Sequence, residues 1–122
     1  MSAAPLPDAP QPLCRLDQVP DGTARGFDPG GAGEDTVFVI RRGERVYAYR
    51  NSCPHNGRPL EYMRHRFLTH DGTQIMCYAH AARFGIEDGV CTHGPCLGAA
   101  LDALPVRVEQ GEIFLDRRGP DD

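Results

Sequence analysis

The chain has no tryptophan, no lysine and no long uninterrupted apolar run. All thirteen basic side chains are arginines, and seventeen acidic side chains outnumber them, which gives a formal net charge of -4. A protein that binds nucleic acid through its phosphates is expected to carry the opposite balance. A transmembrane helix needs about 18 or more consecutive apolar residues, which this sequence lacks. The composition therefore argues against nucleic acid and membrane as partners.

The first residues, MSAAPLPDAPQPL, contain prolines where a secretory signal would have a basic segment followed by an apolar one. We therefore expect a cytoplasmic protein whose thiols stay reduced. Residues 1–12 are expected to form a loose tail. A length of 122 residues leaves room for one small domain, which we place at residues 13–118.

Two segments show the pattern of β-hairpins. TVFVI and RVYAYR flank a glycine turn over Thr36–Arg50, and LPVRVE and EIFLD flank a second glycine turn over Pro105–Asp116. The glycine-rich stretch 21–35 is typical of a loop, and no long amphipathic pattern indicates a helix. These observations predict an all-β fold.

Between the hairpins, residues 50–101 hold four of the five cysteines and all five histidines, and we call this segment the Cys/His block. It contains Cys53-Pro54-His55 and Cys77-Tyr78-Ala79-His80, two tight loops that each pair a thiol with an imidazole. In a reducing compartment such pairs favour a metal over a disulfide. A zinc ion would take all four ligands, whereas a [2Fe–2S] cluster would bind two cysteines on one iron and two histidines on the other. Because each loop mixes the two ligand types, the pattern favours the cluster.

The runs NSCPHNGRPL and CYAHAARFGIEDGVCTHGPC resemble those of Rieske-type [2Fe–2S] proteins, most strongly over Arg50–Leu101. The resemblance implies an all-β fold of three small antiparallel sheets, with the cluster-binding loops at one tip. It also implies one [2Fe–2S] cluster, with Cys53 and Cys77 on the inner iron and His55 and His80 on the outer iron.

The third loop of the family, which shields the cluster, is matched by Gly94-Pro95. Just before it stands a second C-x-H pattern, Cys91-Thr92-His93, but its order in the chain favours Cys53 and His55 as the ligands. The chain departs from small family members in one place, because twenty-one residues separate His55 from Cys77. We attribute the surplus to EYMRHRFLTHDGTQ, which we call the excursion 61–74.

The resemblance also bears on the reduction potential. Rieske proteins of cytochrome bc complexes carry a disulfide between the two ligand loops, where this chain has Arg58 and Ala79. They also carry a serine and a tyrosine that donate hydrogen bonds to the cluster, where this chain has Ala82 and Phe84. Because such bonds stabilise the reduced state, their loss predicts a potential near the bottom of the range of about −150 to +300 mV.

The cysteines and histidines outside the ligand set, and two apolar residues, are expected to have structural roles only. We expect the remaining cysteines to be buried or half-buried thiols, with a Cys91–Cys96 disulfide as the alternative. We expect Leu60 and Phe84 to pack around the cluster and keep water away. The histidines outside the ligand set are expected on solvated loops, and these are His65, His70 and His93.

Arginines outnumber acidic residues in and beside the Cys/His block. They form either an ordinary mixed surface or a basic rim that steers an acidic partner. The arginines concerned are Arg50, Arg58, Arg64, Arg66 and Arg83, against Glu61 and Asp71.

The resemblance implies a soluble one-electron carrier without enzymatic activity of its own, a Rieske-type ferredoxin. It would act as a monomer between a flavin-dependent reductase and a terminal oxygenase. The alternatives are a small subunit of a larger reductase, such as assimilatory nitrite reductase, and a zinc-stabilised structural module. A complete Rieske oxygenase would need a further domain with a two-His-one-carboxylate iron site.

Overall fold

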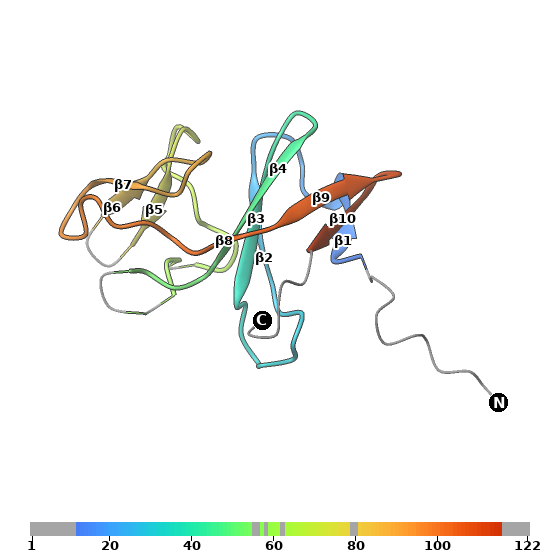
Figure 1. Ribbon diagram of the computed structural model, residues 1–122, viewed down its shortest axis with the longest axis horizontal. Coiled ribbons are helices and arrows are strands. Elements are labelled where there is room, and N and C mark those ends of the chain that lie inside the picture. Colours follow the sequence, from blue (N-terminus) through green and yellow to red (C-terminus); the bar gives the residue numbers. More distant parts are fainter. Residues whose placement is uncertain (1–11, 55–56, 58, 62, 79–80, 116–122) are drawn as a thin grey trace.

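Three small antiparallel sheets make up the fold (Figure 1). The computed structural model describes residues 12–54, 57, 59–61, 63–78 and 81–115. The elements follow one another as β1 (Cys14–Arg15), the 3-10 turn η1 (Leu16–Gln18), β2 (Ala24–Phe27), β3 (Val37–Arg42), β4 (Arg45–Arg50), β5 (Ile75–Cys77), β6 (Ala82–Phe84), β7 (Cys91–His93), β8 (Ala103–Leu104), β9 (Val106–Glu109) and β10 (Glu112–Leu115).

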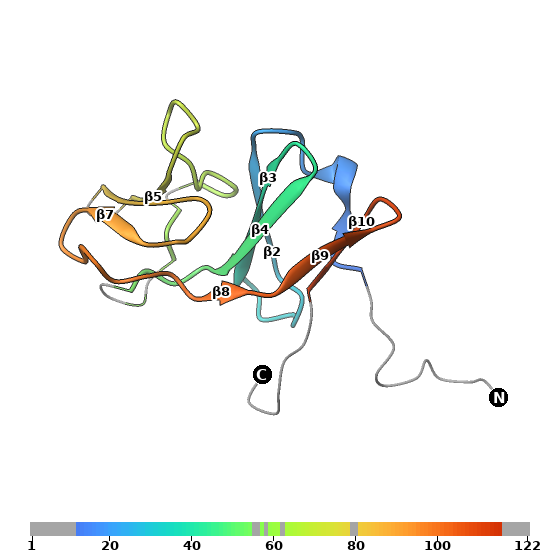
Figure 2. The same cartoon turned by 45° about the horizontal axis from the view of Figure 1, so that its top comes forward.

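The strands pair in the orders β1-β10-β9, β2-β3-β4-β8 and β5-β6-β7. The four-stranded sheet lies in the middle, with β5–β7 on one side and β9, β10 and β1 on the other, as both views show (Figures 1 and 2). The small sheet β5–β7 is built entirely from the Cys/His block. This block therefore forms one end of the molecule.

The central sheet is buried on both faces, and this explains the uninterrupted apolar run of β3. Successive side chains of a strand point to opposite faces. Phe38 and Ile40 belong to the core shared with the Cys/His block, whereas Val39 belongs to the core shared with β10. Phe38 also stacks on Phe67 of the excursion, with ring centroids 4.2 Å apart. One face of the central sheet thus packs against the Cys/His block.

The all-β class and both predicted hairpins are confirmed. The loop predicted over residues 21–35 is wrong in part, because Ala24–Phe27 forms β2 at the edge of the central sheet. The short strands β7 and β8 were not predicted. Strand β7 pairs with the neighbouring β6 through an irregular register, and β8 pairs with β4, which is distant in sequence. Over the described residues, no helix has the length and apolarity to cross a membrane. The predicted tail 1–12 lies outside the described residues except for its last position.

Candidate metal centre

The first ligand loop begins three residues after β4 and carries Cys53. This cysteine is 1% exposed, and its carbonyl oxygen accepts a hydrogen bond from the Gly57 amide at 2.7 Å, which closes a tight turn. Gly57 has a φ of +75°, a conformation that glycine adopts without strain. The predicted ligand His55 lies outside the described residues.

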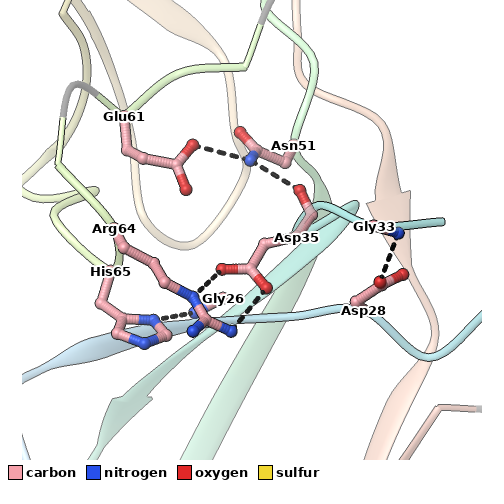
Figure 3. A network of polar contacts seen from close by, with 8 residues as sticks. All are labelled: Gly26, Asp28, Gly33, Asp35, Asn51, Glu61, Arg64 and His65. Carbon is pink, nitrogen blue, oxygen red and sulfur yellow. Dashed lines mark hydrogen bonds and ion pairs between the residues drawn. The ribbon is translucent and has the colours of Figure 1, made fainter. Parts of the chain in front are cut away.

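Asn51 holds both ends of this loop together. Its Oδ1 accepts a hydrogen bond from the Leu60 amide at 2.8 Å, across the loop. Its Nδ2 donates to the Asp35 carbonyl oxygen at 2.9 Å and to Oε1 of Glu61 at 2.8 Å (Figure 3). The side chain is buried, and three hydrogen bonds satisfy its amide. Sequence reasoning missed Asn51, although an asparagine beside a turn often bonds to nearby backbone.

The second ligand loop joins β5 to β6. Cys77, which is 1% exposed, is the last residue of β5 and pairs with Ala82, the first residue of β6. The loop is tied to the first one, because the Tyr78 amide donates to the Leu60 carbonyl oxygen at 2.8 Å. His80, the other predicted imidazole ligand, lies outside the described residues. Leu60 therefore connects the two loops through its own backbone.

The third loop packs against the second. Gly94 has a φ of +106°, and a Cβ placed there would lie 2.9 Å from the Cβ of Ala82. Only glycine permits this approach, which brings Gly94-Pro95 onto the start of β6. The family's third loop was expected at this position.

The second C-x-H pattern does not form a convergent pair. Cys91 is buried, and its Sγ donates to the His93 carbonyl oxygen at 3.1 Å. The His93 ring is exposed, with Nδ1 2.9 Å from Oγ1 of Thr92. The choice between this pattern and Cys53 with His55 stays a prediction.

The described residues fit one half of a two-cysteine, two-histidine centre. Cys53 and Cys77 are buried in one cluster, and the Leu60 backbone joins their loops. Thiolates are the ligands that iron–sulfur clusters require, and shielding from water suits an inner iron. Among the described residues, which exclude His55 and His80, no group of three metal-ligating side chains converges.

An ion pair ties the excursion to the central sheet. Nε and Nη2 of Arg64 donate to the two carboxylate oxygens of Asp35 at 2.8 and 3.1 Å (Figure 3). The hydrogen bond from Arg64 lowers the pKa of the buried Asp35 carboxyl. The positive charge of Arg64 is thus paired with the Asp35 carboxylate. Arg64 is therefore less suited than expected to attract an acidic partner as part of a basic rim. Arg50, Arg66 and Arg83 are exposed, and Arg58 lies outside the described residues.

His65 differs from the solvated loop residue that was expected. It is half-buried, and its Nδ1 accepts a hydrogen bond from the Gly26 amide of β2 at 3.0 Å (Figure 3). Burial, helped by the charge of Arg64, lowers the pKa of His65. His70 and His93 are exposed, as expected.

The remaining predictions concern burial. Leu60 and Phe84 are fully buried, in the same core cluster as the two predicted ligand cysteines. Cys14 is half-buried and Cys91 and Cys96 are buried, and all are free, so the expected thiols are confirmed.

Comparisons with known proteins place this geometry in context. Residues 9–109 match the Rieske [2Fe-2S] domain. The chain is similar to the ferredoxin of carbazole 1,9a-dioxygenase from Nocardioides aromaticivorans IC177, with 31% identity and a TM-score of 0.70, over 90% of this chain and 99% of that chain. No curated protein sequence matches the chain.

Two further solved structures share the fold. The ferredoxin of Sphingomonas yanoikuyae B1 has 24% identity and a TM-score of 0.70, over 90% of this chain and 100% of that chain. A chain in the complex of reduced oxygenase and oxidized ferredoxin of carbazole 1,9a-dioxygenase has 26% identity and a TM-score of 0.67, over 86% of this chain and 90% of that chain.

Proposed function

Because the chain belongs to the Rieske [2Fe–2S] domain family, we propose that it is a one-electron carrier, a ferredoxin of an oxygenase system. It would take electrons from a flavin-dependent reductase and deliver them to a terminal oxygenase. The observation that carries this proposal is the match to a dioxygenase ferredoxin over 99% of that chain at 31% identity. The carrier domain would span residues 13–118, with the Cys/His block between two hairpins, and act as a monomer.

The proposed ligands are Cys53 and Cys77 for one iron and His55 and His80 for the other. Two buried thiols on joined loops support the cysteine half of this assignment. When bound, the cluster supplies reversible one-electron chemistry, and imidazole ligation places its potential at about −150 to +300 mV. Asn51 and Leu60 hold the two loops next to each other through hydrogen bonds.

The potential is proposed to lie near the bottom of that range. Ala82 and Phe84 are fully buried on β6 and carry no hydroxyl that could donate to a cluster sulfur. A midpoint above about +100 mV would contradict this proposal, since it lies well inside the upper part of the range. The potential should fall at alkaline pH, because ferric iron lowers the pKa of the remote nitrogens of its imidazole ligands.

The partner is proposed to dock on the end formed by the Cys/His block. Among the described residues, the large apolar side chains with high exposure all lie there, with Tyr78 at 56%, Leu97 at 69% and Met63 at 51%. Tyr78 follows the ligand Cys77, and Leu97 lies in the third loop. Exposed apolar groups beside a redox centre suit a short-lived protein contact.

The alternatives receive less support. A small subunit of a nitrite-reductase-like complex would share the fold, but the structures reported above are named as ferredoxins or as a ferredoxin–oxygenase complex. A zinc module is disfavoured because residues 9–109 match an iron–sulfur domain family, although zinc could accept the same four side chains.

A single-turnover experiment tests the carrier function. The protein is reduced anaerobically, freed of excess reductant and mixed with the oxidised terminal oxygenase of the Nocardioides carbazole system. We expect one electron per chain to leave the carrier, followed by full recovery on renewed reduction. A protein that takes up no electron reversibly would contradict the proposal.

A further inference from the structure

Two cysteines outside the proposed ligand set lie in direct contact. Cys91 begins β7 and Cys96 lies in the third loop, and they are 2% and 7% exposed. The Cys96 thiol donates to Sγ of Cys91, with the two sulfur atoms 3.1 Å apart. Cys91 in turn donates to the His93 carbonyl oxygen. The two thiols therefore face each other inside the protein.

The surrounding backbone keeps this pair together. The Cys91 amide donates to the Ala99 carbonyl oxygen at 2.7 Å, and the Gly98 amide donates to the Cys91 carbonyl oxygen at 3.1 Å. The Ala99 amide donates to the Cys96 carbonyl oxygen at 2.8 Å. These bonds link both cysteines to the same short segment, so the backbone keeps the two residues close to each other.

We propose that Cys91 and Cys96 form a redox modification site, a thiol pair that a small peroxide oxidises to an intramolecular disulfide. A disulfide bond is about 2.05 Å long, so the sulfur atoms need to approach by about 1 Å. One thiol attacks the peroxide oxygen, which breaks the O–O bond and yields a sulfenic acid and water. The second thiol attacks that sulfur and expels a second water. Hydrogen peroxide is thereby reduced to two waters while two thiols lose their hydrogens.

The burial of the pair selects the oxidant. A bulky disulfide has little access to sulfur atoms on residues that are 2% and 7% exposed, whereas peroxide is hardly larger than water. Burial, together with the hydrogen bond to Cys91, raises the pKa of Cys96 to about 12. Because the thiolate is the reactive form, the reaction should be slow.

The site lies where a cross-link would affect the proposed metal centre. Cys91 and Cys96 bracket Gly94-Pro95, and Gly94 packs on Ala82 at the end of the second ligand loop. A disulfide would therefore restrict the conformation of the third loop, which packs on that loop. The inference does not rest on the proposed electron-carrier function, because the thiol pair needs no metal.

Peptide mapping of the intact holoprotein tests the proposal. The protein is treated with hydrogen peroxide in mildly alkaline buffer, its free thiols are alkylated, and it is digested with trypsin. Cys91 and Cys96 fall on one peptide, residues 84–107, and at least one arginine separates it from each other cysteine. We expect this peptide to carry no alkyl group and to weigh two hydrogens less, and dithiothreitol should restore both alkylation sites.

Two variants serve as controls, and Cys14 calibrates the dose. Cys96→Ser should abolish the reversible product, whereas Cys14→Ser, on the distant strand β1, should leave it unchanged. The proposal is overturned if peptide 84–107 stays fully reduced at a dose that oxidises half of Cys14. It is equally overturned by sulfinic acid without a disulfide, or by a cross-link to Cys53 or Cys77. The visible spectrum of the same sample reports separately whether a cluster was present.

Discussion

Asn51 shows how one side chain can organise a loop that is proposed to bind a metal cluster, without being one of the proposed ligands. It bonds to the backbone of Leu60 on one side and to Asp35 and Glu61 on the other. The hydrogen bond with Leu60 closes the loop that carries Cys53. The hydrogen bond to the Asp35 carbonyl oxygen anchors this loop to the segment before β3. A buried amide with all three bonds made is costly to replace, because a lost partner leaves another polar group unsatisfied.

Replacing Asn51 by aspartate should therefore destabilise the protein. The new carboxylate faces the Asp35 carbonyl oxygen and the Glu61 carboxylate, where the amide had donated two hydrogen bonds. We expect the free energy of unfolding to fall by about 2–3 kcal/mol, measured by denaturant titration. Glu61→Gln, added to the Asn51→Asp variant, supplies a hydrogen-bond donor opposite the new aspartate. The double variant should therefore recover part of the lost free energy of unfolding. Equal stability of the single and double variants would show that this contact is unimportant.

Ala82 provides the residue-scale test of the low potential. We expect Ala82→Ser to raise the midpoint potential, because a hydroxyl there could donate to a cluster sulfur. A bond that favours the reduced state tenfold raises a one-electron potential by about 59 mV. Ala103→Ser, at an exposed site on β8, should leave the potential unchanged. An unchanged or lower midpoint in Ala82→Ser would contradict the explanation.

At the scale of elements, the excursion 61–74 is fastened to the central sheet by contacts of three kinds. Phe67 stacks on Phe38 of β3, Arg64 pairs with Asp35, and His65 accepts from Gly26 of β2. The long insertion between the two loops therefore helps to support the proposed metal centre. His65 holds a positive φ of 70°, which its bond to β2 helps to maintain.

The contact of His65 predicts a pH dependence of stability. Its Nδ1 accepts a hydrogen bond, so the folded protein favours the neutral ring, and its pKa is lowered from 6.5. The unfolded chain takes up a proton first as pH falls, so this contribution to stability is present above about pH 6.5 and is lost below it. We expect His65→Asn, whose amide oxygen accepts without titrating, to lose less stability between pH 7 and pH 5 in thermal melts.

His70→Asn is the matched control, because His70 lies on the same excursion at an exposed site. It should keep the wild-type pH dependence. If His65→Asn and the wild type lose stability in parallel, the neutral ring is not being stabilised by β2.

The elements that could be predicted from sequence are those whose pattern is local. The hairpin over Thr36–Arg50 is predicted by β-branched and aromatic residues on both sides of a glycine turn. Strand β2 could not be predicted, because Ala24–Phe27 lies among glycines and becomes a strand only through pairing with β3. The cysteine–histidine spacing is likewise a local pattern, and the ligand assignment drawn from it stays a prediction. The support by Asn51, Asp35 and His65 depends on contacts between distant segments, which spacing does not encode.

At the scale of the whole molecule, an acidic protein presents exposed arginines at the end that carries the proposed metal centre. Arg66 and Arg83 are exposed there, whereas Arg64 is held by Asp35. Together with the exposed apolar residues Tyr78 and Leu97, they make this end suited to an acidic partner surface.

Charge reversal at Arg66 should slow electron delivery to the terminal oxygenase. We expect the second-order rate constant to fall several-fold at low salt, because steering acts on the encounter, and the difference to shrink as salt screens the charges. Stopped-flow measurement over a range of ionic strength checks this. Arg42→Glu, exposed at the far end of β3, is the control and should have little effect. Equal rates for both variants would leave an ordinary mixed surface as the better description.

The central claim is that Cys53, Cys77, His55 and His80 hold one [2Fe–2S] cluster. The most direct measurement combines iron, zinc and acid-labile sulfide analysis of anaerobically purified protein with pulsed paramagnetic resonance after reduction. We predict two irons and two sulfides per chain, with nitrogen couplings from two imidazole ligands. Zinc without sulfide, or a cluster that shows no nitrogen coupling, would contradict the account.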